Sequence, residues 1–248
     1  MKKNIIVFLS LYLLSSISLG GELTGSQILK KIDDNQYLDF ATMETRMIIH
    51  GRSGTRTIGS KSWTSGKDQS FSEYMSPARE RGKKMLKIKD RLWTYTPEPE
   101  DRVIVISGHL LKQSVAGSDL SYEDYMGNDS MSEDYQATVV GAEKIGEFDC
   151  KVLELTAKRP DVNYHKRKIW VDTKKWLPIK TDLLAKSGKA LKRMEIKNIM
   201  KVGHRWYPKE MFFKDLLSSG NGTEYHIDSI DLTTKIPKKR FSKSSLRN

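Results

Sequence analysis

The sequence predicts a mainly β protein, a single half-open antiparallel β-barrel of about ten or eleven strands with a short N-terminal helix and a helical lid. Short runs with period-two alternation recur along the chain, and turn residues separate them at hairpin spacing. One irregular segment, 108–131, interrupts these runs. Because so many strands cannot form a flat sheet, we expect the sheet to curl, with the irregular segment covering its apolar concave face.

Residues 1–20 have the pattern of a secretory signal peptide. Lys2 and Lys3 precede an apolar run over 5–14, small residues follow as far as Gly20, and no cysteine near this point offers a lipid attachment site. Cleavage after Gly20 would leave residues 21–248 as one soluble exported domain. The alternative is an uncleaved anchor, but the apolar run is shorter than the about 20 residues that span a membrane.

A helix over 24–35 is predicted to begin the mature fold. Thr24 and Gln27 fit a capping box, and apolar residues at 28, 29 and 32 share one helical face. The predicted strand runs of the first half cover 41–49, 55–63, 69–75, 81–89, 91–96 and 102–106. Those of the second half cover 135–144, 148–157, 166–172, 177–184, 190–200, 207–217 and 223–232.

The segment 108–127 breaks the strand rhythm. Leu110 and Leu111 predict one helical turn, and Ser121 in front of Tyr122 predicts the start of another. An irregular segment beside an apolar sheet can cover it, and ligand release requires a cover that moves. The segment is therefore our candidate for a lid.

The formal net charge of +12 indicates attraction to anionic surfaces or simple solubility, and an exported destination disfavours nucleic acid. Between Arg79 and Arg91 the basic residues alternate with apolar ones, as on the solvent face of strands. Cys150 is the single cysteine, so no disulfide forms within the chain, and we expect it to be a buried small hydrophobe.

The motifs of common hydrolases, metalloproteases and nucleotide-binding proteins are absent from the sequence: G-x-S-x-G, S-x-x-K, H-E-x-x-H and G-x-x-x-x-G-K-[ST] do not occur. The five histidines lie singly in different predicted elements. The acidic group Asp119, Glu123 and Asp124 could bind a cation, but the start of a helix explains its last two members equally well. We therefore predict no enzyme, no cofactor and no metal.

Large, soft apolar side chains are enriched, with ten methionines and five tryptophans. Methionine suits adaptable pockets but also fills ordinary cores, so both interpretations stay open for the methionines of the strands. These are Met43, Met47, Met75, Met85, Met194, Met200 and Met211.

Several short motifs follow one another along the mature chain. They are Tyr74-x-x-Pro77, Arg81-Gly82-x-x-Met85-Leu86, Leu92-Trp93-x-Tyr95-x-Pro97, Arg102-Val103, the run Gly117-Ser118-Asp119-Leu120-Ser121-Tyr122-Glu123-Asp124, Trp170-Val171-Asp172, Leu177-Pro178 and Trp206-Tyr207-Pro208. Their combined order resembles the LolA-like family of outer-membrane lipoprotein-sorting proteins, over essentially the whole mature chain.

The resemblance implies a periplasmic, non-enzymatic carrier that holds acyl chains of lipoproteins or other lipids on its concave face. Each buried methylene stabilises such a complex by about 0.8 kcal/mol. An inner-membrane exporter and an outer-membrane acceptor are further candidate partners, and nucleic acid is not expected. The alternative function is an envelope stress sensor or interaction module of the same fold. A lipid hydrolase using Ser118 or Ser121 with Asp119 or His109 is a third hypothesis.

We expect particular side chains to form the acyl-chain cavity and the gate. The predicted cavity residues are Met47, Trp63, Phe71, Met75, Met85, Trp93, Leu110 and Leu111. The predicted gating residues are Arg81, Asp119 and Tyr122, with Arg81 as the candidate for the lid-contacting arginine of the family.

Overall fold

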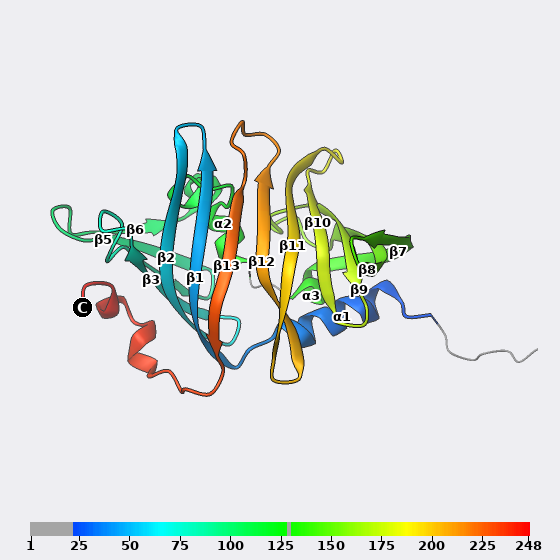
Figure 1. Ribbon diagram of the computed structural model, residues 1–248, viewed down its shortest axis with the longest axis horizontal. Helices are drawn as coiled ribbons and strands as arrows, with labels where there is room; N and C mark the ends of the chain where they lie inside the picture. Colours follow the sequence, from blue (N-terminus) through cyan, green and yellow to red (C-terminus); the bar gives the residue numbers. More distant parts are fainter. Residues whose placement is uncertain (1–21, 128–129) are drawn as a thin grey trace, which may run out of the picture.

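The computed structural model describes residues 22–127 and 130–248, and their strands form one continuous antiparallel sheet that curls without closing (Figure 1). The predicted signal peptide over 1–20 lies outside these residues. A mainly β, half-open fold is confirmed. Each run located in the sequence forms a strand of its own, so the sheet has 13 strands and the expected total of ten or eleven was too low.

The strand order is β6-β5-β4-β3-β2-β1-β13-β12-β11-β10-β9-β8-β7. The strands of the first half are β1 (Phe40–Gly51), β2 (Gly54–Ser65), β3 (Gln69–Ser76), β4 (Lys84–Ile88), β5 (Arg91–Thr96) and β6 (Arg102–Ile106). Those of the second half are β7 (Tyr135–Ile145), β8 (Phe148–Ala157), β9 (Lys166–Asp172), β10 (Leu177–Leu184), β11 (Ala190–Val202), β12 (Arg205–Asp215) and β13 (Thr223–Asp231). The chain therefore starts at the middle of the sheet, runs to one edge, crosses to the other and returns.

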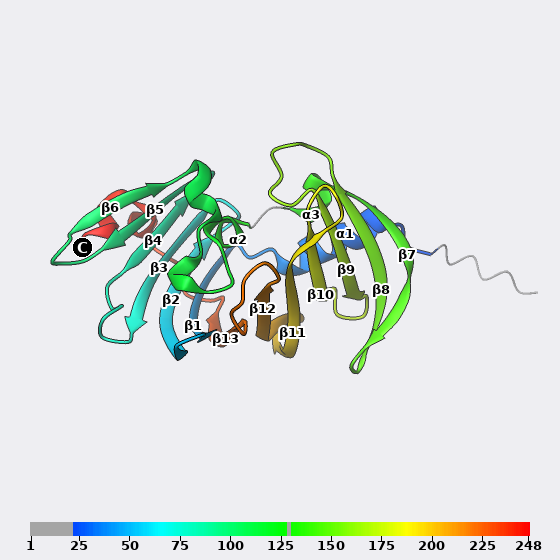
Figure 2. The ribbon, with the colours of Figure 1, turned by 90° about the horizontal axis from the view of Figure 1, so that it is seen from above.

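That crossing explains where the irregular segment lies. The connection from β6 to β7 joins the two opposite edges of the sheet, and it carries η1 (Gly108–Lys112), η2 (Val115–Gly117), α2 (Tyr122–Met126) and α3 (Met131–Asp134). Figure 2 shows α2 and α3 within the hollow of the curved sheet. Ser121 accepts from the backbone of Asp124 and caps α2, which confirms the predicted helix start.

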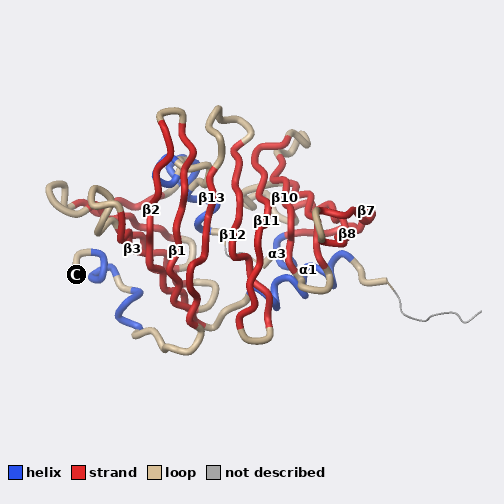
Figure 3. Tube along the Cα trace, in the orientation of Figure 1, coloured by secondary structure: helices blue, strands red, loops and turns tan. Residues whose placement is uncertain are grey.

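Helix α1 (Gly25–Gln36) covers the sheet next to β7 (Figure 3). Thr24 and Gln27 form the predicted capping box, and the predicted apolar face is buried against strands β7 to β9. A Cβ atom at Gly25 would lie 2.3 Å from the carbonyl oxygen of Ala137 on β7, so a side chain there would push the helix off the sheet. Asp33 then accepts from the backbone N–H groups of Met131 and Ser132, each at 2.9 Å, and so caps α3.

Both faces of the first half of the sheet are covered. Toward the hollow, Tyr74, Met85 and Leu92 pack under the 108–127 segment. Toward the opposite face, Phe71, Leu86 and Trp93 pack against the C-terminal 3-10 turns η3 (Lys238–Phe241) and η4 (Lys243–Leu246). Members of the two sets are neighbours in the sequence, as Met85 and Leu86 are, because successive strand residues point to opposite faces.

The single thiol, Cys150 of β8, is buried among Val152, Trp170 and Leu177. Burial raises the pKa of this thiol to about 11, so very little thiolate exists at pH 8. We expect iodoacetamide to leave the folded protein unmodified over an hour at pH 8 and to alkylate it fully in urea, as read by intact mass. Rapid alkylation of the folded protein would contradict the burial of Cys150.

Candidate functional site

Two adjoining cavities occupy the hollow of the sheet. The first, here called the insert cavity, has a volume of about 260 Å³ and lies between the segment 108–127 and strands β10 to β12. The second, here called the helix cavity, has a volume of about 360 Å³ and lies beside the end of α1. Gln36, Gly127 and Pro208 line both. Ligand pockets commonly measure about 300–1,000 Å³, so the two spaces together suit a small elongated ligand.

The insert cavity has an apolar floor and a charged rim. Its floor consists of Leu183 of β10, Met194 and Ile196 of β11, and Met211 and Phe213 of β12. They share one face of the sheet because Met194 pairs with Phe213 and Ile196 with Met211 across neighbouring strands. Such a floor can receive an acyl chain, because apolar contact replaces its exposure to water.

The rim of the insert cavity carries carboxylates of the lid segment opposite basic residues of the sheet and its loops. These residues are Asp119, Glu123, Asp124, Arg167, Lys192, Arg193 and Lys214. The cavity is therefore amphipathic, with its charges gathered where the floor meets the lid.

The helix cavity is lined by aromatic rings and hydroxyl groups and has fewer charged side chains than the insert cavity. Met43, Leu38 and the rings of Tyr125, Tyr207 and Tyr225 supply its apolar surface. Hydroxyl side chains line the rest, from Ser62, Thr64, Ser70 and Ser130. The hydroxyl of Tyr207 is buried and has no hydrogen-bond partner among the described residues, which is unusual for a buried polar atom.

Asp124 fastens the lid segment to the second half of the sheet. Its carboxylate accepts from Lys192 Nζ at 2.5 Å and from the hydroxyl of Tyr164 at 2.7 Å, and both partners lie outside the lid. Burial by itself would raise the pKa of Asp124, but the charge and hydrogen bond of Lys192 outweigh it, and the pKa lies below its usual range. Asp124 is therefore ionised at neutral pH and holds the lid through these two contacts, which are called the latch below.

Asp119, a predicted gating residue, holds the same side of the lid. Its carboxylate accepts from Thr223 Oγ1 at 2.9 Å and from the backbone N–H of Asp215 at 2.8 Å. Its own N–H donates to Thr223 at 3.0 Å, and Lys214 lies 3.8 Å away. These contacts join the lid to the ends of β12 and β13.

Strands β2 to β4 hold the other side of the lid. Arg56 donates to the carbonyl of Ala116, and Lys87 donates to the carbonyl of Met126 at 2.5 Å. The hydroxyl of Tyr125 donates to Ser72 at 2.8 Å. The lid thus bridges both halves of the hollow, and releasing it requires breaking contacts on both sides.

Five of the predicted residues share one apolar cluster between the sheet and the lid: Met47 and Met85 belong to strands, and Leu110, Leu111 and Tyr122 belong to the lid itself. The space beside Met47 and Met85 is about 50 Å³, and an open pocket of about 540 Å³ with a largely polar lining lies beside Met85, Leu110 and Tyr122, between the lid and strands β3 to β6. The insert cavity and the helix cavity lie toward β10 to β12 and α1, where the sequence had marked Met194 and Met211 only as members of the methionine set. Met194 and Ile196 lie two residues apart on β11, as do Met211 and Phe213 on β12. This spacing was the sequence signal that these side chains share one face of the sheet.

Other predicted residues lie away from the hollow. Trp63, Phe71 and Trp93 pack on the opposite face of the sheet, under the C-terminal turns. Met75 is 47% exposed. Arg81 donates to the carbonyl of Met75 at 3.0 Å in the turn after β3, and the arginine that contacts the lid is Arg56. Alternation identifies which residues share a face, but it does not say which face is hollow.

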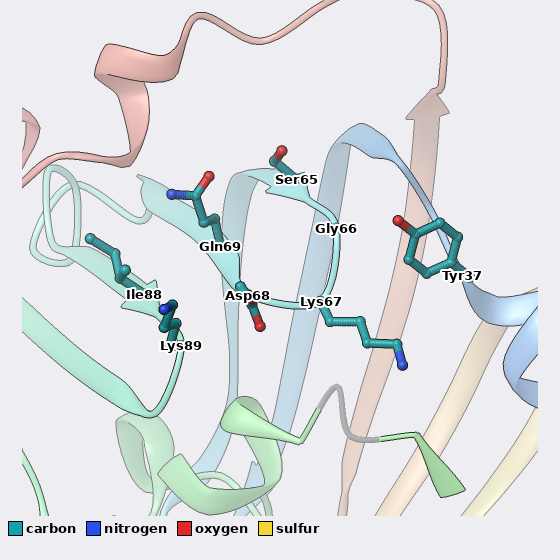
Figure 4. Close-up of a pocket in the computed structure, with 8 residues that line it drawn as sticks. All are labelled: Tyr37, Ser65, Gly66, Lys67, Asp68, Gln69, Ile88 and Lys89. Atoms are coloured by element: carbon teal, nitrogen blue, oxygen red, sulfur yellow. The ribbon is translucent and has the colours of Figure 1, made fainter. Parts of the chain in front are cut away.

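A third depression, of about 510 Å³, lies at the turn between β2 and β3. Tyr37, Lys67, Asp68 and Gln69 contribute to its wall, and Figure 4 shows their side chains around the open turn. Tyr37 and Lys67 also line the helix cavity, so this polar depression adjoins it. A surface of this polarity does not replace the hydrophobic contact that an acyl chain needs.

Two of the histidines meet on the outer face of the sheet. His50 and His226 both lie against the carboxylate of Glu224, at 2.8 and 2.9 Å. The sequence had placed them in separate strands, and the pairing of β1 with β13 brings them together. Their hydrogen bonds, first that of His226, hold the pKa of Glu224 below its usual range.

In the described ranges, no helix has the length and apolar character needed to cross a bilayer. An open curved sheet whose hollow is roofed by a crossing segment defines the LolA-like class of fold. Solved structures of other proteins have the same fold. A DUF1329 family protein from Desulfovibrio piger aligns with a TM-score of 0.83 and 24% identity, over 90% of this chain and 98% of that one.

Two further solved structures have the same fold. A putative outer membrane lipoprotein-sorting protein domain from Vibrio parahaemolyticus aligns with a TM-score of 0.79 and 22% identity, over 90% of this chain and 98% of that one. A LolA superfamily protein from Nitrosomonas europaea aligns with a TM-score of 0.74 and 24% identity, over 90% and 100%. No curated protein matches.

A family model described as "-like: Uncharacterized protein" matches residues 66–248, and the chain belongs to this family. The match covers more than half of the chain. The resemblance to LolA-like proteins that the sequence motifs predicted is confirmed at the level of the fold.

Proposed function

We propose that this protein is a non-enzymatic carrier that holds acyl chains of lipids or lipoproteins in the periplasm, on the way to the outer membrane. The observation that supports it most is the pair of adjoining cavities, roofed by a segment held through side-chain contacts. A lipid needs an apolar floor to be held and a movable roof to be released. The lipoprotein-sorting description of a structural neighbour agrees with this proposal.

The serines of the lid do not favour hydrolysis. Ser118 donates to the carbonyl of Leu120, and Ser121 donates to Asp124, so neither hydroxyl is directed by a histidine. Lys192 lies 3.1 Å from the hydroxyl of Ser121, but it donates to that oxygen and pairs with Asp124, which is not the arrangement of a base that accepts the hydroxyl proton. A sensor or interaction module of the same fold remains the alternative, and it predicts a stable protein partner without lipid.

Native mass spectrometry of the protein from a periplasmic extract tests the proposal. We expect masses that exceed the protein by one lipid, and uptake of phospholipid or lipoprotein by stripped protein. Met194→Lys places a charge on the floor of the insert cavity and should abolish the bound mass. Leu217→Lys, at a position that is 61% exposed, is the matched control and should keep it. Protein that is always empty and takes up no lipid would refute the carrier.

A further inference from the structure

Arg167 is a cation in the wall of the insert cavity. It extends from β9, and its guanidinium carbon lies 4.6 Å from the centre of the Tyr135 ring and 6.0 Å from that of Tyr164. Contact with aromatic faces occupies none of the five N–H donors of a guanidinium. The rings therefore fix the position of Arg167 and leave its hydrogen-bonding capacity unused.

The other basic residues of the cavity have carboxylate partners. Lys192 pairs with Asp124, Arg193 pairs with Asp182 through two hydrogen bonds, and Lys214 lies 3.8 Å from Asp119. Within 22–127 and 130–248, the side chain of Arg167 has neither an ion pair nor a hydrogen bond, and its Nε atom is buried.

The carboxylate of Glu123 also lines the cavity, but it is not within ion-pair distance of Arg167. With Asp182, the partner of Arg193, included, the four basic side chains face four carboxylates, and Arg167 and Glu123 are the two of these charged side chains that have no ion pair among the described residues. Buried or half-buried charges are ordinarily paired, and an arginine is particularly suited to a planar or tetrahedral oxyanion.

The apolar floor begins beside this charge. Arg167 pairs directly with Leu183 across strands β9 and β10, and Met194 of β11 and Phe213 of β12 continue the same surface. Three inter-strand spacings, each about 4.8 Å, separate β9 from β12. An amphiphile with a charged group at Arg167 would lay its tail along this floor.

We infer that the cargo is an anionic amphiphile, with its phosphate or carboxylate bound by Arg167 and its chain lying on the Leu183, Met194 and Phe213 floor. The inference rests on the proposed carrier function and adds the chemical class of the ligand. Fatty acids and phospholipids share this chemistry and differ in the oxyanion they present.

The test compares three ligands with the same sixteen-carbon chain: hexadecanoic acid, hexadecyl phosphate and hexadecanol. Binding to the lipid-stripped full-length mature protein is measured by native mass spectrometry titration at pH 7.5. We expect the two anions to bind at least about tenfold more tightly than the alcohol, because hydrogen bonds to charged groups are the stronger ones. The ranking of acid against phosphate identifies the source of the oxyanion.

Variants test whether the preference for the two anions over hexadecanol depends on Arg167. Arg167→Gln should bring the affinities of both anions to within about threefold of hexadecanol without changing the affinity of hexadecanol, and Arg167→Lys should keep part of the preference. Lys168→Gln is the matched control, since Lys168 follows Arg167 on β9 but lies over the Trp170 ring and does not line the cavity, and it should keep the full preference.

The outcomes separate the two hypotheses. Equal binding of all three ligands by the unmodified protein, or a preference that survives in a folded Arg167→Gln, would overturn the anionic cargo and leave the carrier standing. If none of the three binds, the carrier proposal itself fails and the inference fails with it. The comparison within the unmodified protein does not depend on whether any variant folds.

Discussion

Replacing Asp124 by asparagine is expected to release the lid segment, with amide hydrogen exchange over 107–127 accelerated at least about tenfold. The substitution removes the negative charge of the Asp124 side chain, which accepts hydrogen bonds from Lys192 and Tyr164. All three side chains are mostly buried. A hydrogen bond to a charged group contributes about 1.5–3 kcal/mol, which corresponds to this acceleration or more. Exchange in the strands should change far less, because the latch joins the lid to the sheet and does not hold the sheet itself.

Asp182→Asn is the control for this experiment. Asp182 is also mostly buried and pairs with Arg193, but its partner lies on the neighbouring strand and not in the lid. It should leave exchange over 107–127 unchanged. If both variants accelerate the lid equally, or neither does, the lid is not held by Asp124.

The latch also has a defined dependence on pH. Because the pKa of Asp124 is lower in the folded protein than its ordinary value of 3.8, its contribution is complete above that value and is lost as the pH falls through the folded value. Lid exchange, corrected for intrinsic rates, should therefore be constant from pH 7 to pH 5 and rise only below about 3.8. The asparagine variant should lack this acid transition.

Leu246→Ala is expected to lower the free energy of unfolding by about 2–5 kcal/mol, and Phe241→Ala by about 3–5 kcal/mol. Both side chains are buried, Leu246 completely, and they cover Phe71, Leu86 and Trp93 on the face opposite the hollow. Each truncation leaves a cavity and exposes part of this cluster. In a domain of this size, each 1 kcal/mol lowers Tm by about 2–4 °C.

Urea unfolding monitored by tryptophan fluorescence measures these losses, with Leu217→Ala as the control. Leu217 is 61% exposed, so the same truncation there should change the free energy of unfolding by less than about 0.5 kcal/mol. A Leu246→Ala variant as stable as Leu217→Ala would show that the C-terminal turns do not stabilise the sheet. Lipid binding should persist in folded protein, since these turns lie away from the cavities.

Local structure was largely predictable. The capping box at Thr24, the helix start at Ser121 and every strand run correspond to elements of the structure. These features depend on neighbours in the chain, namely hydrogen bonds to nearby backbone groups and a side-chain period of two. The total of the strands was underestimated, although each run had been located.

The candidate site was only partly predictable. Met47 and Met85 were expected to line one acyl-chain cavity, but the space that they share under the lid is about 50 Å³, and Met85 also lines a separate open pocket of about 540 Å³. Trp63 and Trp93 have the same sequence signature, yet they pack on the other face, because the C-terminal turns provide a second apolar cover. Whether the predicted residues contact a ligand stays a prediction.

The sequence by itself determined the elements, the curl of a long antiparallel sheet and the segment that interrupts it, because each of these follows from short-range patterns. The tertiary structure alone decided which face is hollow, since that depends on the return of β13 to β1 and on the crossing of the lid between the two edges. It alone also left Arg167 unpaired while its neighbours Lys192 and Arg193 are paired. Charge compensation is a property of atoms brought together across the fold, and no sequence spacing encodes it.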